Sequence, residues 1–365
     1  MQSISIDVRM SQHTGIGRYI RGLLSALTLH PARWQYHLIG NKDFQKKFQS
    51  EWPYHETSAP IYSLSEQVAI PFSARHSDCL HVPHYNAPLL WGKKLVVTIH
   101  DLIHLHFKED LQSPLARLYA KTMLPQIAKR ADHIIAVSQY TKDDLVKTLG
   151  VNPVKITVVH HGIDLSFLKM GSPEPDFSSM ASSPYFLCVG LLKKHKNIGV
   201  LIDAFLNLKR KLNRSKINLI LVGNPDQKQL VVREWLRKIS GEQSIQVLSH
   251  ISDEKLKQLY RNAVALVYPS LYEGFGFPLL EAMASRTPII AAHTSSIPEV
   301  LGEETALFFD PHSVAELEKH MEDVINNQNL REQLIQRGVK RLSVFDWKIT
   351  AQKTAKVYES VLGSN

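Results

Sequence analysis

The sequence has few cysteines and no long apolar run. Cys79 and Cys188 are the only cysteines among 365 residues, which excludes a disulfide framework and favours a reducing compartment. No segment approaches the ~20 consecutive apolar residues that a membrane-spanning helix requires. The chain begins with an alternating strand, residues 4–8, and has no basic leader before it. We therefore expect a cytoplasmic protein.

Patterns typical of metal sites are also absent from the sequence. The two cysteines are not spaced as metal ligands, and no Asp-x-Asp motif occurs. The histidine pairs His104/His106 and His160/His161 are of a kind that more often packs or lies on the surface than binds a metal. The sequence thus predicts neither a bound metal nor a cofactor.

Acidic residues are in the minority, which gives a formal net charge of +9. Residues 1–165 hold 18 Lys and Arg against 13 Asp and Glu, a net of +5. The cations are scattered, and no basic motif with interleaved aromatic residues occurs, which argues against nucleic acid as a partner. A solvated basic face is the simplest interpretation. The alternative is a weak, salt-dependent attachment to anionic headgroups on the inner face of a membrane.

Short apolar strands alternate with longer amphipathic segments, which predicts parallel α/β layers. A chain of this length exceeds the ~250 residues at which single cores stop growing, so we expect two Rossmann-like domains, residues 1–168 and 184–345. A Pro-, Gly- and Ser-rich stretch, residues 169–183, separates them as a linker. The expected strands are residues 4–8, 36–39, 95–99, 133–137, 156–159, 185–189, 217–222, 245–248, 263–268, 288–291 and 306–309.

Two acids bracket a strand-to-helix turn in the second half. Glu273 and Glu281 are eight residues apart in Tyr-Glu-Gly-Phe-Gly-Phe-Pro-Leu-Leu-Glu. The glycines at 274 and 276 permit close approach of a ligand, and the N–H groups of the helix start, around Leu279 and Leu280, would bind an anion. A carboxylate accepts two hydrogen bonds from a vicinal diol. A diphosphate between two such acids suggests a nucleotide-sugar.

The alternative is that Glu281 only complements the helix dipole and Glu273 is a solvated loop acid. The whole segment, with Gly274-Phe275-Gly276 between the acids, resembles the retaining glycosyltransferases of family 4. The resemblance implies the GT-B fold: two Rossmann-like domains face a central cleft, and a C-terminal helix, residues 346–365, crosses back to the first domain. It also implies that Glu273 lies by the donor sugar and that Glu281 binds the ribose hydroxyls.

Further motifs extend this resemblance to nearly the whole chain. By themselves, glycines before a helix bring backbone donors to phosphates, and polar groups after strands lie where ligands gather. The family pattern implies donor contacts for Gly17, Arg18 and His100 in the first domain, and Ser138, at a comparable strand end, is expected to contact phosphate. In the second domain it implies contacts by Gly190 and by Lys196 as the phosphate-binding lysine, with His195 standing where the family often has arginine, and readout of the base at His250 or Ile251.

Each of these positions has a plainer interpretation. His100 could bond a nearby carbonyl while Asp101 caps the next segment, and the cations around Lys196 could be a solvated helix start. In the resembled family the donor phosphate is thought to accept the acceptor proton, so no protein nucleophile is needed. Glu273, His100 and Lys196 are then the catalytic residues of a metal-independent transfer.

We therefore expect a retaining enzyme that transfers a hexose, with mannose preferred, from a GDP- or UDP-sugar to a lipid-linked or polysaccharide acceptor. Two alternatives stay open: a nucleotide-sugar epimerase of the same fold, which would act without an acceptor, and a catalytically silent nucleotide-sugar-binding subunit.

Overall fold

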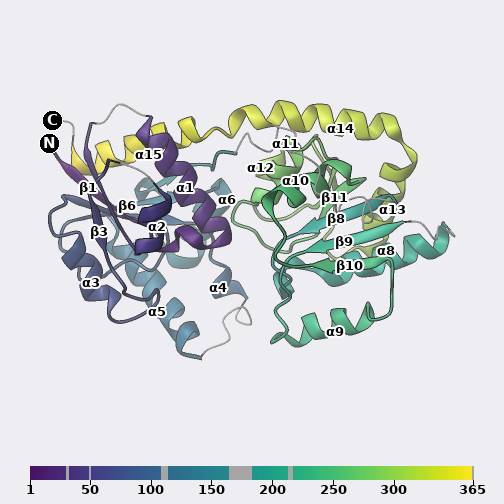
Figure 1. Cartoon of the computed structure of the whole chain (residues 1–365), viewed down its shortest axis with the longest axis horizontal. Helices are drawn as coiled ribbons and strands as arrows, with labels where there is room; N and C mark the ends of the chain where they lie inside the picture. The colour runs from purple at the N-terminus through teal and green to yellow at the C-terminus, as the bar shows by residue number, and fades with distance from the viewer. Residues whose placement is uncertain (30–32, 49–50, 108–113, 164–182, 213–216, 364–365) are drawn as a thin grey trace. The chain divides into compact units, whose positions relative to one another are not determined.

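The computed structural model describes the chain except for residues 30–32, 49–50, 108–113, 164–182, 213–216 and 364–365 (Figure 1). The chain divides into two compact units. The N-terminal unit comprises Met1–Gly162 and Phe345–Asn365, and the C-terminal unit comprises Ile163–Val344. Residues 169–182 of the expected linker lie outside the described residues.

The N-terminal unit is built on a parallel sheet with the strand order β3-β2-β1-β4-β5-β6-β7. Neighbouring strands pair in parallel throughout, for example Ile4 with Tyr36 and Val96 with His133. The strands are β1 (Ser3–Asp7), β2 (Gln35–Gly40), β3 (Tyr54–Glu56), β4 (Cys79–Val82), β5 (Lys94–Ile99), β6 (His133–Ala136) and β7 (Ile156–Val158). The sequence did not predict β3, a short strand at the sheet edge, or β4, whose buried His81 interrupts the apolar pattern.

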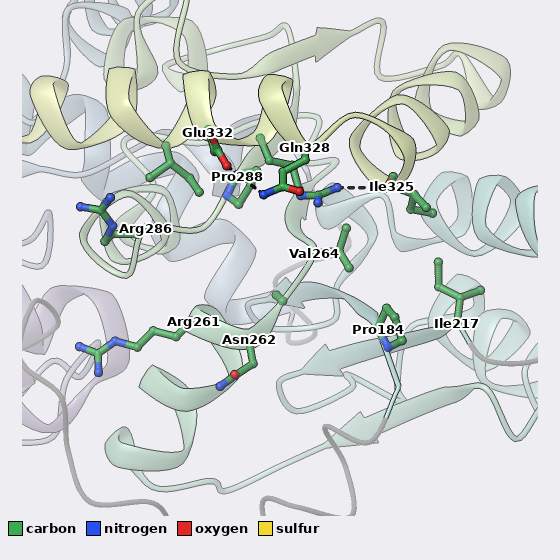
Figure 2. A pocket seen from close by; sticks show the side chains of 13 residues that line it. Pro184, Ile217, Arg261, Asn262, Val264, Arg286, Pro288, Ile325, Gln328 and Glu332 are labelled. Atoms are coloured by element: carbon green, nitrogen blue, oxygen red, sulfur yellow. Dashed lines mark hydrogen bonds between the residues drawn. The ribbon is translucent and has the colours of Figure 1, made fainter.

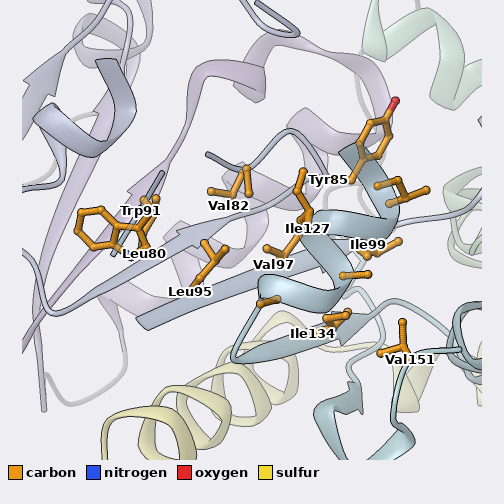
Figure 3. Packing of buried hydrophobic residues seen from close by; sticks show 14 of the residues in the cluster. Leu80, Val82, Tyr85, Trp91, Leu95, Val97, Ile99, Ile127, Ile134 and Val151 are labelled. Carbon is orange, nitrogen blue, oxygen red and sulfur yellow. The ribbon is translucent and has the colours of Figure 1, made fainter. Parts of the chain in front are cut away.

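Helices cover this sheet and bury an aliphatic core. Figure 3 shows Leu80, Val82, Leu95 and Val97 of β4 and β5 next to Ile127 of α5, all almost completely buried. The helices are α1 (Thr14–Thr28), α2 (Lys42–Lys47), α3 (Glu66–Ser73), α4 (Ile103–His106), α5 (Pro114–Arg130), α6 (Gln139–Leu149) and α15 (Trp347–Leu362), with 3-10 turns η1 (Arg9–Gln12) and η3 (Pro153–Lys155).

The C-terminal helix α15 packs on the N-terminal unit, as expected. Asp346 caps it by accepting a hydrogen bond from the Lys348 N–H at 2.8 Å. The Trp347 ring lies 6.4 Å from that of Tyr19 on α1. Further along α15, the Tyr358 hydroxyl lies 2.6 Å from Nδ1 of His81 on β4. These contacts, with α15 running beside α1, confirm the predicted return of the chain (Figure 1).

The C-terminal unit holds a second parallel sheet, ordered β10-β9-β8-β11-β12-β13. The strands are β8 (Tyr185–Val189), β9 (Asn218–Val222), β10 (Ile245–Leu248), β11 (Ala265–Tyr268), β12 (Ile289–Ala292) and β13 (Leu307–Phe309). The helices are α8 (Ile198–Lys211), α9 (Leu230–Lys238), α10 (Asp253–Asn262), α11 (Phe277–Ala284), α12 (Ile297–Leu301), α13 (Val314–Asn326) and α14 (Gln328–Arg341), with 3-10 turns η5 (Lys194–Lys196) and η6 (Leu342–Val344). The predicted α/β class with two parallel Rossmann-like sheets is confirmed.

Each sheet has one position where its strand order reverses. This switch point lies between β1 and β4 in the N-terminal unit and between β8 and β11 in the C-terminal unit. Ligands of open parallel sheets bind outside the carboxyl ends of the strands at such a point. Within the described part of the chain, no helix is both long and apolar enough to span a membrane.

Candidate functional site

Lys196 and Glu273 form an ion pair at the switch point of the C-terminal sheet. Lys196 ends η5, shortly after β8, and Glu273 follows the neighbouring strand β11. The Lys196 Nζ lies 2.5 Å from Glu273 Oε1, and the two side chains are only 15% and 12% exposed. The structure therefore brings together two of the predicted catalytic residues, one of each charge.

The surroundings of Glu273 favour its ionised form. Burial by itself raises the pKa of this carboxyl, but the charge of Lys196, the neighbouring His195 and the hydrogen bond from Lys196 outweigh burial and lower the pKa below its ordinary value. The hydroxyls of Tyr268 and Ser270 are buried beside it, and neither completes a hydrogen bond of good geometry with a described residue. Buried donors without a good partner are uncommon in native proteins, and they suit a site that receives a polar ligand.

The loop that carries Glu273 is held from two sides. The Glu273 N–H donates to the Ser295 hydroxyl at 3.0 Å, and the Glu273 carbonyl accepts from the Ser296 hydroxyl at 2.9 Å. The Leu271 N–H donates to the His195 carbonyl at 2.8 Å, which joins the loop to η5. Lys196 and Glu273 are thus positioned by short, cross-linked segments, as a binding site requires.

The start of α11 differs in detail from the sequence prediction. Gly276 caps the helix with φ of 103°, a conformation that favours glycine. The N–H of Leu279, expected to be free for an anion, donates to the Gly276 carbonyl at 3.0 Å, because the first helical turn is already closed. Side chains of Leu279 and Leu280 are fully buried, so any ligand contact they make is through the backbone.

Glu281 lies inside the C-terminal unit with 1% exposure. Its Oε2 accepts a hydrogen bond from the Tyr260 hydroxyl at 2.8 Å. This partner on α10 was not predicted, since the sequence gives no register between the two helices. A carboxylate has capacity for further hydrogen bonds, so ribose binding by Glu281 stays a prediction.

Two glycines bring the ends of β8 and β9 together. Gly223 has φ of 151°, and a Cβ there would overlap the carbonyl of Gly190, so only glycine fits. A Cβ on Gly190 would lie 3.6 Å from Cε of Lys196, an ordinary van der Waals distance. His250, with φ of 55°, is exposed, and Ile251 is half-buried beyond β10. The positions expected to meet the base are therefore accessible, and their contact with it stays a prediction.

In the N-terminal unit, Gly17 does not lie in a loop before a helix as predicted. The helix α1 already begins at Thr14, and the Gly17 N–H donates to the His13 carbonyl at 3.0 Å. A Cβ on Gly17 would lie 2.5 Å from the Ser11 carbonyl oxygen, so close packing against η1 explains the glycine. Arg18 is half-buried on the same helix, and donor contacts by either residue stay predictions.

His100 and Ser138 follow β5 and β6 and are both engaged within the N-terminal unit. Nε2 of His100 bonds the Pro83 carbonyl at 2.9 Å, and Asp101 accepts a hydrogen bond from the Ile103 N–H at 3.0 Å. The alternative interpretation, in which His100 bonds a carbonyl and Asp101 caps the next segment, therefore matches contacts in the structure. The Ser138 hydroxyl caps α6 by accepting from the Thr141 N–H at 3.0 Å. A phosphate contact by Ser138 stays a prediction, as does sugar binding through the other nitrogen of His100.

Two family models together cover most of the chain. Residues 13–167 match the model described as glycosyltransferase family 4, and residues 176–341 match the one described as glycosyl transferases group 1. The O-antigen chain mannosyltransferase RfbU of Salmonella typhimurium is 31% identical over 267 residues, which span 73% of this chain and 68% of RfbU. The chain belongs to glycosyltransferase family 4.

Other comparisons agree with this assignment. The O-antigen chain mannosyltransferase B of Escherichia coli is 27% identical to the glycosyltransferase over 283 residues, 76% of this chain and 73% of the relative. The solved structure of Anabaena HepE in complex with UDP-glucose superposes with a TM-score of 0.77 at 18% identity, over 99% of this chain and all of HepE. That likeness shows the shared GT-B fold.

The glycosyltransferase also has a pocket of about 920 Å³ at the opposite edge of the C-terminal sheet. Its lining includes Pro184, Ile217, Val264 and Pro288 (Figure 2), which immediately precede β8, β9, β11 and β12. This is the amino edge of the sheet, away from the carboxyl ends where Lys196 and Glu273 lie. Ligands of open parallel sheets bind at the carboxyl ends of the strands, so we do not assign this pocket as the donor site despite its size.

Sequence reasoning missed several residues around the ion pair of this glycosyltransferase. Tyr268, Ser270, Ser295 and Ser296 contact or lie beside the Glu273 loop. Tyr268 and Ser270 stand at the end of an expected strand, a position that could have identified them. Nothing in the sequence marks the two serines before α12. Among the described residues, no group of three His, Cys, Asp or Glu side chains converges on a point where a metal could bind.

Proposed function

We propose that this glycosyltransferase is a retaining, metal-independent hexosyltransferase that uses a nucleotide-diphosphate sugar as its donor. The observation that carries the proposal is the Lys196–Glu273 pair at the β8/β11 switch point. A leaving nucleoside diphosphate gains negative charge as the glycosidic bond breaks, and a fixed cation stabilises that charge. Lys196 supplies the cation, and the backbone around Gly190 and Gly276 permits close approach of the phosphates.

Glu273 is assigned to the donor sugar and Glu281 to the ribose. Glu273 carries a negative charge beside the reacting centre, where it stabilises an oxocarbenium-like sugar and accepts hydrogen bonds from its hydroxyls. In the transfer step the bond from C1 to the diphosphate oxygen breaks while the acceptor oxygen bonds C1 on the same face. The acceptor proton passes to the departing phosphate oxygen, so no protein nucleophile is required.

The remaining predicted contacts complete the donor assignment. His100 binds a donor-sugar hydroxyl, and Gly17, Arg18 and Ser138 contribute from the N-terminal unit. In the C-terminal unit, His195 and Lys196 face the diphosphate, and His250 or Ile251 meets the base through the backbone.

The comparisons favour mannose as the transferred sugar. RfbU and mannosyltransferase B are both named O-antigen chain mannosyltransferases, which supports GDP-mannose as the donor and a lipid-linked or polysaccharide acceptor. HepE, in contrast, was solved with UDP-glucose, so a UDP-sugar is the competing donor. We place the enzyme in the cytoplasm.

An exposed apolar stripe supports weak attachment to a membrane surface. Leu64, Val68 and Phe72, spaced by four residues along and just before α3, are 86%, 64% and 65% exposed. Arg75 stacks over the Phe72 ring at 4.2 Å, and Lys93 donates to the Arg75 carbonyl at 2.9 Å. An apolar stripe with cations beside it is typical of contact with an anionic lipid surface.

A panel of GDP-, UDP-, ADP- and dTDP-sugars tests the donor assignment. We expect GDP-mannose to raise the melting temperature and to be hydrolysed slowly, equally well with EDTA present, with the α-anomer released first in proton NMR. Glu273→Gln should reduce hydrolysis at least about 100-fold if the charge stabilises the transition state. Glu303→Gln, at an exposed glutamate, is the matched control.

Several outcomes would contradict the proposal. Activity that requires added metal would overturn the role of Lys196, and release of the β-anomer would overturn retention. Full activity of Glu273→Gln would remove that residue from the mechanism. Conversion of the nucleotide-sugar into its epimer without acceptor, or binding with no turnover at all, would favour the epimerase or the silent subunit instead.

A further inference from the structure

A chain of buried polar side chains ends at His84, at the switch point of the N-terminal sheet. Arg9, just after β1, pairs with Glu66 at 3.0 Å. The Asn86 Nδ2 donates to Glu66 Oε2 at 3.1 Å, and Asn86 Oδ1 lies 3.2 Å from Nδ1 of His84. Glu66, Asn86 and His84 are 0%, 1% and 7% exposed. No sequence motif indicated this series of side-chain contacts, which links three separate segments of the polypeptide.

This series of hydrogen bonds, from Arg9 to His84, fixes which nitrogen of His84 carries its proton. Oε2 of Glu66 faces the Arg9 guanidinium at 3.0 Å, and a guanidinium can only donate hydrogen bonds, so this oxygen is an acceptor. Asn86 must then turn its NH₂ to Glu66 and its carbonyl oxygen to His84. Because that oxygen is also only an acceptor, the proton of His84 lies on Nδ1, and Nε2 carries a lone pair.

The His84 ring is neutral. Burial lowers its pKa well below the ordinary value, and the neighbouring His100 and His104 lower it further. Nε2 makes no hydrogen bond with any described residue, and His84 is 7% exposed. A neutral acceptor nitrogen repels phosphate and carboxylate and attracts a hydroxyl.

His100 presents a second acceptor next to the first. Its Nε2–H donates to the Pro83 carbonyl, so its lone pair lies on Nδ1, which has no hydrogen-bond partner in the described part of the chain. The two imidazole rings are 6.5 Å apart. Together they offer two hydroxyl-binding nitrogens at the carboxyl ends of β4 and β5.

An exposed aromatic ring borders the same place. Tyr62 has φ of 62°, a strained conformation for a residue other than glycine, and its side chain is 40% exposed. Its ring lies 5.8 Å from that of His84 in an edge-on arrangement and 5.8 Å from that of Tyr85. Strained backbone of this kind clusters at ligand sites, and aromatic lining with a few fixed polar groups is typical of them.

We propose that His84 is a saccharide-binding residue whose Nε2 accepts a hydrogen bond from a hydroxyl of the acceptor sugar. Glu66 and Asn86 are positioning residues that hold the required tautomer, and Tyr62 covers the bound sugar. The inference rests on the proposed glycosyl transfer, since it gives the second substrate its place. A metal ion bound to His84 and His100 is less favoured, because no third ligand converges there among the described residues.

The tautomer is measured directly by ¹⁵N NMR of the full chain with labelled histidine. His84→Phe identifies the His84 signals. At pH 7.5 we expect the Nδ1–H form of His84 and the Nε2–H form of His100. Asn86→Leu should move His84 toward the Nε2–H form, since the acceptor for Nδ1–H is gone. A wild-type His84 that is charged, or that carries its proton on Nε2, would overturn the proposal without requiring any variant to fold.

Binding is measured with the methyl glycosides of mannose, glucose, galactose and N-acetylglucosamine. We expect at least one to shift the His84 Nε2 signal, and His84→Phe to weaken its binding roughly ten-fold or more. His76→Phe, at an exposed histidine of the same unit, should bind like wild type. If no glycoside shifts Nε2, if His84→Phe binds normally, or if zinc alone shifts it, the proposal fails. Donor binding by the wild type, measured in the same samples, tests the proposed function separately.

Discussion

The hydroxyl of Tyr358 on the last helix lies 2.6 Å from Nδ1 of His81 on β4, 277 residues away. The other nitrogen of His81 is 2.9 Å from Oγ1 of Thr98, which also meets the Tyr19 hydroxyl at 2.9 Å. The C-terminal helix is thus tied to the centre of the N-terminal sheet through a buried, neutral imidazole.

This arrangement predicts that acid destabilises the fold. Burial lowers the pKa of His81 to about 3 and that of His84 and His161 well below the ordinary value. These histidines are neutral when folded but take up protons when unfolded, below pH ~6.5. The unfolded state therefore binds more protons, and stability falls as the pH falls from 6.5 toward 5, by ~1.4 kcal/mol per pH unit for each histidine.

Urea denaturation at pH 7.5, 6.5, 5.5 and 5.0 measures this loss. The window lies above the range where most carboxylates titrate, so the slope reports the histidines. A free energy of unfolding that stays constant down to pH 5 would contradict the prediction.

Close packing between Gly22 and Trp347 predicts a second stability effect. A Cβ on Gly22 would overlap the Trp347 indole, whereas a Cβ on Gly15 of the same helix α1 would meet nothing within 4 Å. Gly22→Ala should therefore destabilise the protein by ~1–3 kcal/mol through overpacking. Gly15→Ala should stabilise it by up to ~1 kcal/mol, because alanine is the better helix former. Equal effects in chemical denaturation would show that Trp347 does not anchor α15 there.

The strand pattern was predictable because most strands are continuous apolar runs bounded by polar turns. The two strands that the sequence did not indicate show the limit. The strand β3 is short and lies at the sheet edge, while β4 contains His81, whose ring nitrogens bond Thr98 on the next strand and Tyr358, 277 residues away. Periodicity cannot show a hydrogen bond whose partner is hundreds of residues away.

In the candidate site, too, some features were predictable from the sequence and others were not. Lys196 and Glu273 were each predicted from their local motifs, but their ion pair spans 77 residues and follows from the adjacency of β8 and β11. Gly17 was predicted to contact the donor, which stays a prediction. The structure adds a packing reason for this glycine that the sequence could not show, because a Cβ there would lie 2.5 Å from the Ser11 carbonyl oxygen. The His84 tautomer was not predictable, since Glu66 and Asn86 define it only after folding.

The exposed stripe on α3 predicts binding to anionic vesicles. Phe72→Glu removes an aromatic side chain that would enter the headgroup region and adds a repelled charge. Burial of a large apolar side chain is worth ~1.5–3 kcal/mol, so we expect roughly ten-fold weaker co-sedimentation with vesicles containing 30% phosphatidylglycerol. Leu230→Glu, at a residue that is 70% exposed on α9, is the control and should bind like wild type. Vesicle binding that is unchanged by both Phe72→Glu and added salt would contradict membrane contact through this stripe.

The Lys196–Glu273 pair predicts a change in pH dependence. Burial raises the pKa of Glu273, and Lys196 is the main group that reverses this effect. In Lys196→Met only the weaker influences of His195 and Ser270 oppose burial, so the pKa of Glu273 should rise and the carboxyl should take up its proton at a higher pH. Carboxyl ¹³C NMR of labelled glutamate, with Glu273→Gln for assignment, follows the titration. Lys193→Met, which removes a cation from the same segment without breaking an ion pair with a described residue, should leave the titration unchanged. A Glu273 titration that is the same in Lys196→Met and wild type would show that the pair does not set the charge of the donor site.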